Sequence, residues 1–136
     1  MRPIILTILS AAVLAAAPAA VSAREKLAPE DQLAKLLKDR VAGEPQNCIT
    51  LSSVTSSQVI DKTAIVYKIG GTYWVNRPKD AESLDDDDVL VTKTTGSQLC
   101  SIDTVQLHDR SSHFWTGFVS LGEFVPYRKV KTASGQ

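Results

Sequence analysis

The chain has 136 residues, with 15 Lys and Arg against 15 Asp and Glu, and a formal net charge of +0 at pH 7. This balance lacks the positive field by which nucleic-acid-binding proteins attract phosphate, so we expect no nucleic acid as partner. The length suits one domain with a modest core.

The first residues have the three parts of a secretory signal peptide. Arg2 precedes an apolar run from Ile4 to Ala17, and small residues follow at Val21-Ser22-Ala23. A membrane anchor is the alternative, but the run is shorter than the roughly 20 residues that span a bilayer. We therefore predict a signal peptide over residues 1–23, cleavage after Ala23, no membrane span in the mature protein, and a periplasmic or secreted location.

The first predicted element of the mature chain is an amphipathic helix from Pro29 to Gly43. Pro29 suits a first helical turn, and Gly43 is a plausible C-cap. Four apolar residues recur at helical spacing and form one stripe: Leu33, Leu36, Leu37 and Val41. We expect the helix to pack on the rest of the domain, and a helix that binds a partner is the alternative.

The remaining chain alternates short β-branched and aromatic runs with turn residues. Gly70-Gly71 separates two such runs and predicts a hairpin with a type I′ turn. A two-residue turn pairs Tyr67 with Trp74 and Val66 with Val75, so both faces of the hairpin are partly apolar. The strands are expected at 48–51, 58–61, 64–69, 72–77, 89–93, 104–108, 114–121 and 123–128.

Many short strands with regular turns predict a mainly β (α+β) fold, a small antiparallel β-barrel or sandwich with one N-terminal amphipathic helix. We expect a single domain over residues 24–128 and a flexible C-terminal tail over residues 129–136. Pro126 cannot donate a ladder hydrogen bond, so 123–128 is predicted to be an edge strand. Gly117 and Gly122 indicate bulges or close strand approach.

Cys48 and Cys100 are the two cysteines of the chain. An even count in an exported protein favours a disulfide, and the alternative is a thiol-redox site, which no C-x-x-C spacing supports. In the chain-entropy model a bridge over such a loop contributes about 4 kcal/mol.

Four segments together resemble a family of small exported proteins of Gram-negative bacteria that is known only as a domain of unknown function. The segments are Cys48-Ile49, Tyr73–Pro78, Gln98–Asp103 and Leu121–Tyr127. The resemblance runs from about Arg40 to Arg128. It implies export, and it supplies no activity, cofactor or catalytic residue.

Four consecutive aspartates, Asp85 to Asp88, precede one predicted strand. An EF-hand loop needs alternating oxygen ligands, a glycine at its sixth position and a glutamate at its twelfth, and a loop starting at Asp85 lacks them. We interpret the run as a solvated turn in which Ser83 and Asp86 form a capping box. Weak cation binding and catalysis stay open as alternatives, and no metal ligand is assigned.

The segment from His108 to His113 contains the residue types of a catalytic triad. A triad needs these groups to converge beside an oxyanion hole, and no G-x-S-x-G motif supports one. The spacing of the two histidines fits neither a helical nor a strand-face zinc site. We interpret the segment as a turn in which Asp109 and Arg110 face solvent, and expect His108 to point outward.

Five aromatic residues are candidates for a ligand platform, although aromatic residues in short strands are more often core. We expect them in the core; they are Tyr73, Trp74, Phe114, Trp115 and Phe118.

Because no catalytic or cofactor site stands out, the sequence predicts a non-catalytic exported protein that binds or modulates another envelope protein. A small hydrolase or small-ligand carrier is one alternative, and a cation-responsive domain is another. An exposed aromatic or edge-strand patch would favour the binding protein. A cleft that joins His108 or His113 to a carboxylate and a hydroxyl would favour the hydrolase. No cofactor is expected, and the oligomeric state is left open.

Overall fold

The computed structural model describes residues 25–131. The predicted signal peptide and the end of the predicted tail, residues 132–136, lie outside the described residues. Within 25–131, no helix has the length and apolar character needed to cross a membrane. The described elements are α1 (Pro29–Leu36), β1 (Arg40–Ala42), β2 (Cys48–Thr50), η1 (Leu51–Ser53), β3 (Ser56–Ile60), β4 (Ala64–Ile69), β5 (Thr72–Asn76), η2 (Ala81–Ser83), β6 (Asp88–Thr92), β7 (Gln98–Cys100), β8 (Thr104–Asp109), β9 (Trp115–Ser120) and β10 (Phe124–Lys129).

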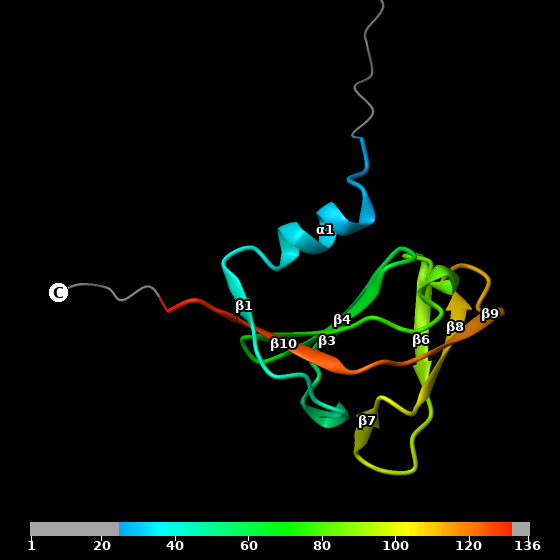
Figure 1. Ribbon diagram of the computed structural model, residues 1–136. Helices are drawn as coiled ribbons and strands as arrows, with labels where there is room; N and C mark the ends of the chain where they lie inside the picture. The colour runs from blue at the N-terminus through cyan, green and yellow to red at the C-terminus, as the bar shows by residue number, and fades with distance from the viewer. Residues whose placement is uncertain (1–24, 132–136) are drawn as a thin grey trace, which may run out of the picture.

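The strands form three antiparallel sheets (Figure 1). Five strands lie in the order β1-β10-β5-β4-β3, two in the order β2-β7, and three in the order β6-β8-β9. No sheet among the described strands closes on itself. The protein is therefore mainly β, with open antiparallel sheets and one short N-terminal helix, as the sequence predicts for the fold class.

The β4–β5 hairpin has the predicted register, with Tyr67 opposite Trp74 and Val66 opposite Val75. The turn type differs from the prediction. Gly70 has a φ of 57°, whereas Gly71 is not among the positive-φ residues of the described chain. A type I′ turn needs positive φ at both central positions and a type II′ turn only at the first, so the geometry meets the requirement of type II′.

Both faces of the five-stranded sheet are buried, because different layers cover them. On one face, Val66 and Val75 pack in a small cluster with Leu33 of α1. On the other face, the main core collects residues from all three sheets: Ile49, Ile65, Tyr67, Trp74, Leu84, Leu99, Val105, Leu107, Val119, Leu121 and Phe124. The prediction that α1 packs on the domain is confirmed.

The helix is shorter than predicted. It ends at Leu36, and Asp39 has a φ of 61°, which turns the chain into β1. Val41 therefore pairs with Arg128 of β10 and is 59% exposed, so it is no part of the helical stripe. Gly43 is not a C-cap, and its N–H donates to the carbonyl of Pro126. Strand pairing with β10 satisfies these backbone groups in place of the last predicted helical turns.

The prediction that β10 is an edge strand is wrong, because β10 lies between β1 and β5. Pro126 is tolerated there because the ladder with β1 is interrupted beside it. Its carbonyl accepts from Gly43, and pairing resumes only at the bridge between Gln46 and Phe124. The missing N–H of the proline therefore faces a break in the neighbouring strand. The strand also includes Lys129, at the start of the predicted tail.

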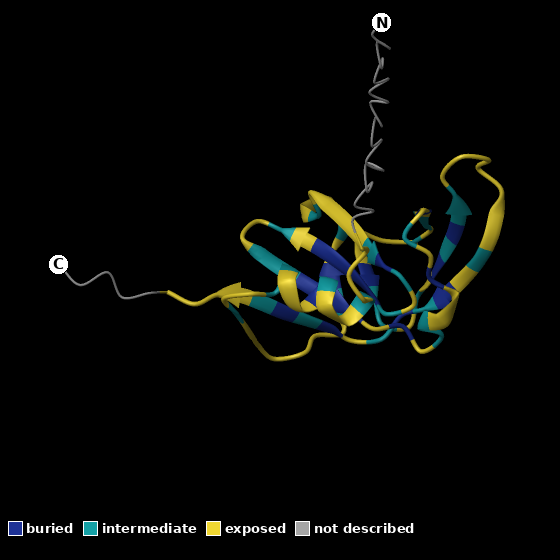
Figure 2. Cartoon of the chain, turned by 90° about the horizontal axis from the view of Figure 1, so that it is seen from above, coloured by how far each residue is buried: buried dark blue, intermediate teal, exposed yellow. Residues whose placement is uncertain are grey.

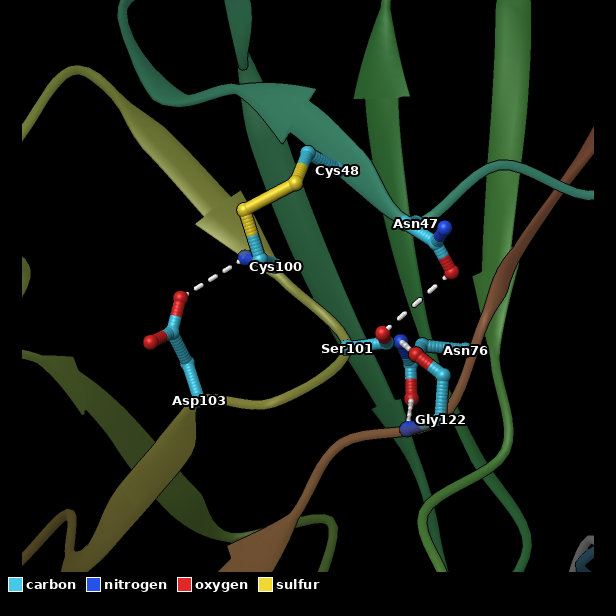
Figure 3. Close-up of a disulfide and its surroundings, with 7 residues drawn as sticks. All are labelled: Asn47, Cys48, Asn76, Cys100, Ser101, Asp103 and Gly122. Atoms are coloured by element: carbon cyan, nitrogen blue, oxygen red, sulfur yellow. Dashed lines mark hydrogen bonds between the residues drawn. A yellow bond between two sulfur atoms is a disulfide. The ribbon is translucent and has the colours of Figure 1, made fainter.

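Asn76 and Gly122 hold β5 against the chain segment before β10 (Figure 3). The Asn76 side chain is fully buried, its Nδ2 donates to the Gly122 carbonyl at 2.7 Å, and its Oδ1 accepts from the Gly122 N–H at 3.0 Å. A Cβ atom on Gly122 would lie 2.7 Å from the carbonyl oxygen of Arg77. The predicted close approach at Gly122 is confirmed.

The structure contains the predicted bond between Cys48 and Cys100, which lie directly opposite each other in the β2–β7 ribbon (Figure 3). The Cys100 N–H donates to Asp103 Oδ2 at 2.7 Å, which supports the turn after β7. Disulfides of this structural kind persist in oxidising compartments. The bond therefore favours an oxidising compartment.

Candidate functional site

The most exposed aromatic side chains of the described chain gather on and just before β9. Phe114 is 76% exposed, Trp115 60% and Phe118 51%. Figure 2 shows β9 as a largely exposed strand at one end of the molecule. The prediction that these three residues belong to the core is therefore wrong. It is right for Trp74, whereas Tyr73 is half-buried on the α1 side of the five-stranded sheet.

The register of the three-stranded sheet places Trp115 and Phe118 on the same face. Trp115 lies opposite His108, which lies opposite Val89, and Phe118 lies opposite Gln106. Directly opposed residues share a face of the sheet. We call Val89, Trp115 and Phe118 the aromatic patch. Val89 is itself 40% exposed.

A β-bulge explains why two aromatic residues three positions apart share this outer face. The register shifts between Leu107 and His108, so Thr116 is the extra residue between Gly117 and Trp115. Without the extra residue, strand alternation would direct Trp115 toward the inner face, where Leu107 is fully buried. A bulge near Gly117 was predicted and is confirmed. Gly117 was the feature of the sequence that indicated a bulge, and the bulge places Trp115 on the outer face of the sheet.

The edge of β9 that faces away from β8 is hydrogen-bonded to another segment at its C-terminal end. Toward its N-terminal end no described strand pairs with it. The Ser120 N–H donates to Asp80 Oδ1 at 2.8 Å, and the Ser120 carbonyl accepts from the Lys79 N–H at 3.1 Å. Ser120 therefore points its backbone groups away from β8. Alternation gives Phe118 the same direction, and β9 pairs with no described strand other than β8.

The residues from His108 to His113 do not assemble a triad. The Ser112 hydroxyl donates directly to Asp109 Oδ1 at 2.8 Å, with no imidazole between the two groups. His108 Nδ1 lies 3.2 Å from the carbonyl of His113, and His108 Nε2 is buried without a partner among the described residues. His113 has a φ of 60° and closes a tight turn. The structure therefore fits the predicted turn, with His108 on the outer face.

The turn carries a pH-dependent prediction. Hydrogen bonds from the Ser112 N–H, the Ser112 hydroxyl and the Ser111 N–H lower the pKa of Asp109. A carboxyl whose folded pKa is depressed stabilises the fold above its unfolded pKa, and this contribution is lost as the pH falls through the folded pKa. We expect the Ser111 and Ser112 amide signals to titrate below the ordinary aspartate range in an NMR pH series.

Asp109→Asn is the control for this titration, because it keeps an acceptor oxygen and removes the ionisable group. Its Ser112 amide signal should not move over the same acidic range. A midpoint at or above the ordinary aspartate pKa in the unsubstituted protein would contradict the prediction.

The four aspartates divide into two groups. Asp88 is buried, begins β6, and accepts from the Thr116 hydroxyl at 3.0 Å, so it does not belong to the solvated turn that was predicted. Asp85, Asp86 and Asp87 bring carboxylate oxygens within 4.8 Å of one another at the surface. Asp88 is outside this group, although its Oδ2 accepts from the Asp85 N–H at 3.3 Å.

Local hydrogen bonds account for the three surface aspartates. Asp85 Oδ1 accepts from the Asp87 N–H at 2.9 Å, and Asp86 forms an ion pair with Lys26. This pairing lowers the pKa of Asp86 and raises the pKa of Lys26. The predicted capping role of Ser83 is wrong: Ser83 ends η2, and in the turn that follows the N–H groups of Asp85 and Asp87 donate to the carboxylates of Asp88 and Asp85. Cation binding stays a prediction.

A surface hollow of about 530 Å³ lies beside the C-terminal end of β9. Its lining includes the polar and charged residues Asn47, Lys79, Thr104, Ser120 and Glu123 beside Ile102 and Leu121. Neither histidine lines it, so it does not supply the combination of imidazole, carboxylate and hydroxyl that a hydrolase would need. The small-ligand carrier and the hydrolase stay predictions.

Comparison with known proteins gives no assignment: no family model, curated protein or solved structure matches the chain. The resemblance to an exported family of unknown function therefore stays a prediction.

Proposed function

We propose that this chain is an exported, non-catalytic protein of the cell envelope that binds or modulates another macromolecule through the aromatic patch. The observation that carries the proposal is the exposure of Trp115 and Phe118 on an edge strand. Contiguous exposed apolar patches are typical of interaction sites, and aromatic side chains dominate the energy of many interfaces.

The export part of the proposal has two supports. The first residues have the charged, apolar and small-residue regions of a signal peptide, with Ala23 as the last residue before cleavage. The disulfide favours an oxidising compartment, of which the periplasm and the extracellular space are examples. Membership of the resembled Gram-negative family is part of the same proposal.

A photo-crosslinking experiment in the native host tests the binding function. A photoreactive phenylalanine analogue placed at Phe118 is expected to capture a reproducible protein partner. The same analogue at Ile102 is the matched control, because Ile102 is apolar and 90% exposed but lies in the turn after β7. Capture from 118 and not from 102 supports the proposal, whereas equal capture or none from both positions contradicts it.

The double variant Trp115→Ala/Phe118→Ala separates binding from folding in the same experiment. Both side chains are more than half exposed, so their loss should change the free energy of unfolding by less than about 1 kcal/mol. Capture from a crosslinker placed instead at Val89 should fall at least about tenfold in this background, because central aromatic contacts carry much of an interface. Unchanged capture would remove the aromatic patch from the proposal.

A further inference from the structure

The β9 strand carries few of the devices by which proteins usually protect a sheet edge, and the bulge at Thr116 is one of them. Its residues from Trp115 to Ser120 contain no charged residue and no proline. Natural edge strands are commonly protected by charged side chains, proline, a β-bulge or a covering segment. Here the covering segment, Lys79-Asp80, forms its hydrogen bonds to β9 only at Ser120. The part of β9 around Phe118, between the bulge at Thr116 and the hydrogen bonds at Ser120, is therefore an open position for another strand.

The geometry of this stretch suits a polypeptide in extended conformation. The N–H and C=O of Ser120 point away from β8, as their hydrogen bonds show. Residues two apart in a strand direct these groups to the same side, so Phe118 also directs its N–H and C=O out of the sheet edge. An added strand would exchange hydrogen bonds with Phe118, and every second side chain of that strand would lie on the outer face beside Trp115 and Phe118. Main-chain bonds would give affinity, and the aromatic contacts would select apolar side chains.

Charge indicates the chemistry of the added strand. The segment 79–87 meets the sheet at both ends of β9. Asp80 accepts from the Ser120 N–H, η2 packs against β9, and Asp87 accepts at its carbonyl from the Arg110 N–H of the β8–β9 turn. Carboxylates outnumber cations along this border, although Asp86 is paired with Lys26: Asp61, Asp80, Glu82, Asp85, Asp86, Asp87 and Asp109 stand against Lys26, Lys62, Lys79 and Arg110. A second copy of the chain would bring a second acidic border to the same place, which disfavours self-pairing.

We propose that the β9 edge takes up an extended segment of a partner protein as an added strand, and that this segment carries lysine or arginine between apolar residues. The inference rests on the proposed function and names the chemistry of its partner. It assigns the backbone contacts to Phe118, the apolar contacts to Trp115 and Phe118, and the charge preference to the acidic border.

An NMR titration of the mature chain tests the proposal. The probes are a short end-blocked peptide of alternating lysine and valine, the same peptide with glutamate for lysine, and a chitooligosaccharide. The lysine peptide is expected to shift the amide signals of Phe118 and its β9 neighbours, and to bind at least about tenfold more tightly than the glutamate peptide. The difference should shrink as salt is raised, because salt screens exposed charges.

Two matched substitutions locate the binding edge. Phe118→Lys places a charge on the open edge of β9 and should reduce lysine-peptide affinity at least about tenfold. Gln58→Lys makes a similar change on exposed β3, the outer strand of the five-stranded sheet, and should leave affinity unchanged. Asp85→Asn/Asp87→Asn should weaken the lysine peptide and leave the glutamate peptide no weaker.

Five outcomes would overturn the inference, and four of them come from the titration. They are shifts centred on β3, equal affinity for the two peptides, binding of the oligosaccharide in place of the peptide, and no shift at millimolar lysine peptide. Concentration-dependent dimerisation that Phe118→Lys abolishes would overturn it too, since a second copy would then occupy the edge. Except in the case of dimerisation, capture of a protein from position 118 in the host would still support the proposed function. Failure of this inference can therefore be distinguished from failure of the proposed function.

Discussion

Asn76→Ala is expected to lower the free energy of unfolding by about 3 kcal/mol. The Asn76 amide is fully buried and both of its ends bond to the backbone of Gly122, at 2.7 Å and 3.0 Å. Alanine removes both bonds and leaves the N–H and the C=O of Gly122 without these partners. The unpaired groups cost more than the bonds themselves contribute, because they lose their solvation on folding.

Urea unfolding of the variant and the unsubstituted protein measures this loss. Asn76→Asp is the informative companion, because it keeps an acceptor for the Gly122 N–H but cannot donate while ionised. Tyr67→Phe is the matched control: its hydroxyl is buried and bonds to no described residue, so its removal breaks no such bond. We expect it to change stability by less than about 1 kcal/mol. A loss below about 1 kcal/mol for Asn76→Ala would contradict the assigned role.

Removing the disulfide by Cys48→Ser/Cys100→Ser is expected to cost about 4 kcal/mol in the chain-entropy model, since the bond joins residues 52 apart in sequence. The ribbon that it closes has only three residue pairs. Ile49 and Leu99 of that ribbon are nonetheless buried in the main core. The bond therefore holds an otherwise marginal ribbon in the position where it covers that core.

Thermal unfolding with and without reductant measures the contribution of the bond. The reduced native protein should unfold near the midpoint of the double variant, and reductant should not change the variant. Intact-mass analysis after alkylation supplies the independent check. Two alkylatable cysteines in protein isolated from an oxidising compartment would contradict the bond, and equal midpoints with and without it would contradict its stabilising role.

Local chemistry explains the predictions that are confirmed. Gly70-Gly71 between two β-rich runs is a strong turn signal, and a two-residue turn dictates the whole register of β4 with β5. The glycine before β10 is required because the Arg77 carbonyl leaves no room for a Cβ. The helix begins at Pro29, as a proline in a first turn predicts.

The wrong predictions concern residues whose structure is decided by pairing with a segment distant in the sequence. The residues after Leu36 have helical periodicity, but β10 offers them a strand partner, and Arg40 adds a guanidinium 3.6 Å from the centre of the Tyr73 ring. The break in β1 beside Pro126 cannot be predicted from β10 alone. The exposure of the β9 aromatics follows from a bulge and from the position of β9 at an edge, and both depend on pairing with β8.

The sequence by itself determined the mainly β class, the β4–β5 hairpin, the two faces of that hairpin and the pair of cysteines available for a bond, because these depend on residues near one another or on residue type. Only the tertiary structure decided which strand lies at an edge and which aromatic side chains face water. A strand side chain alternates between two faces, and one extra residue exchanges them. The candidate binding site therefore arises from sheet order and one bulge.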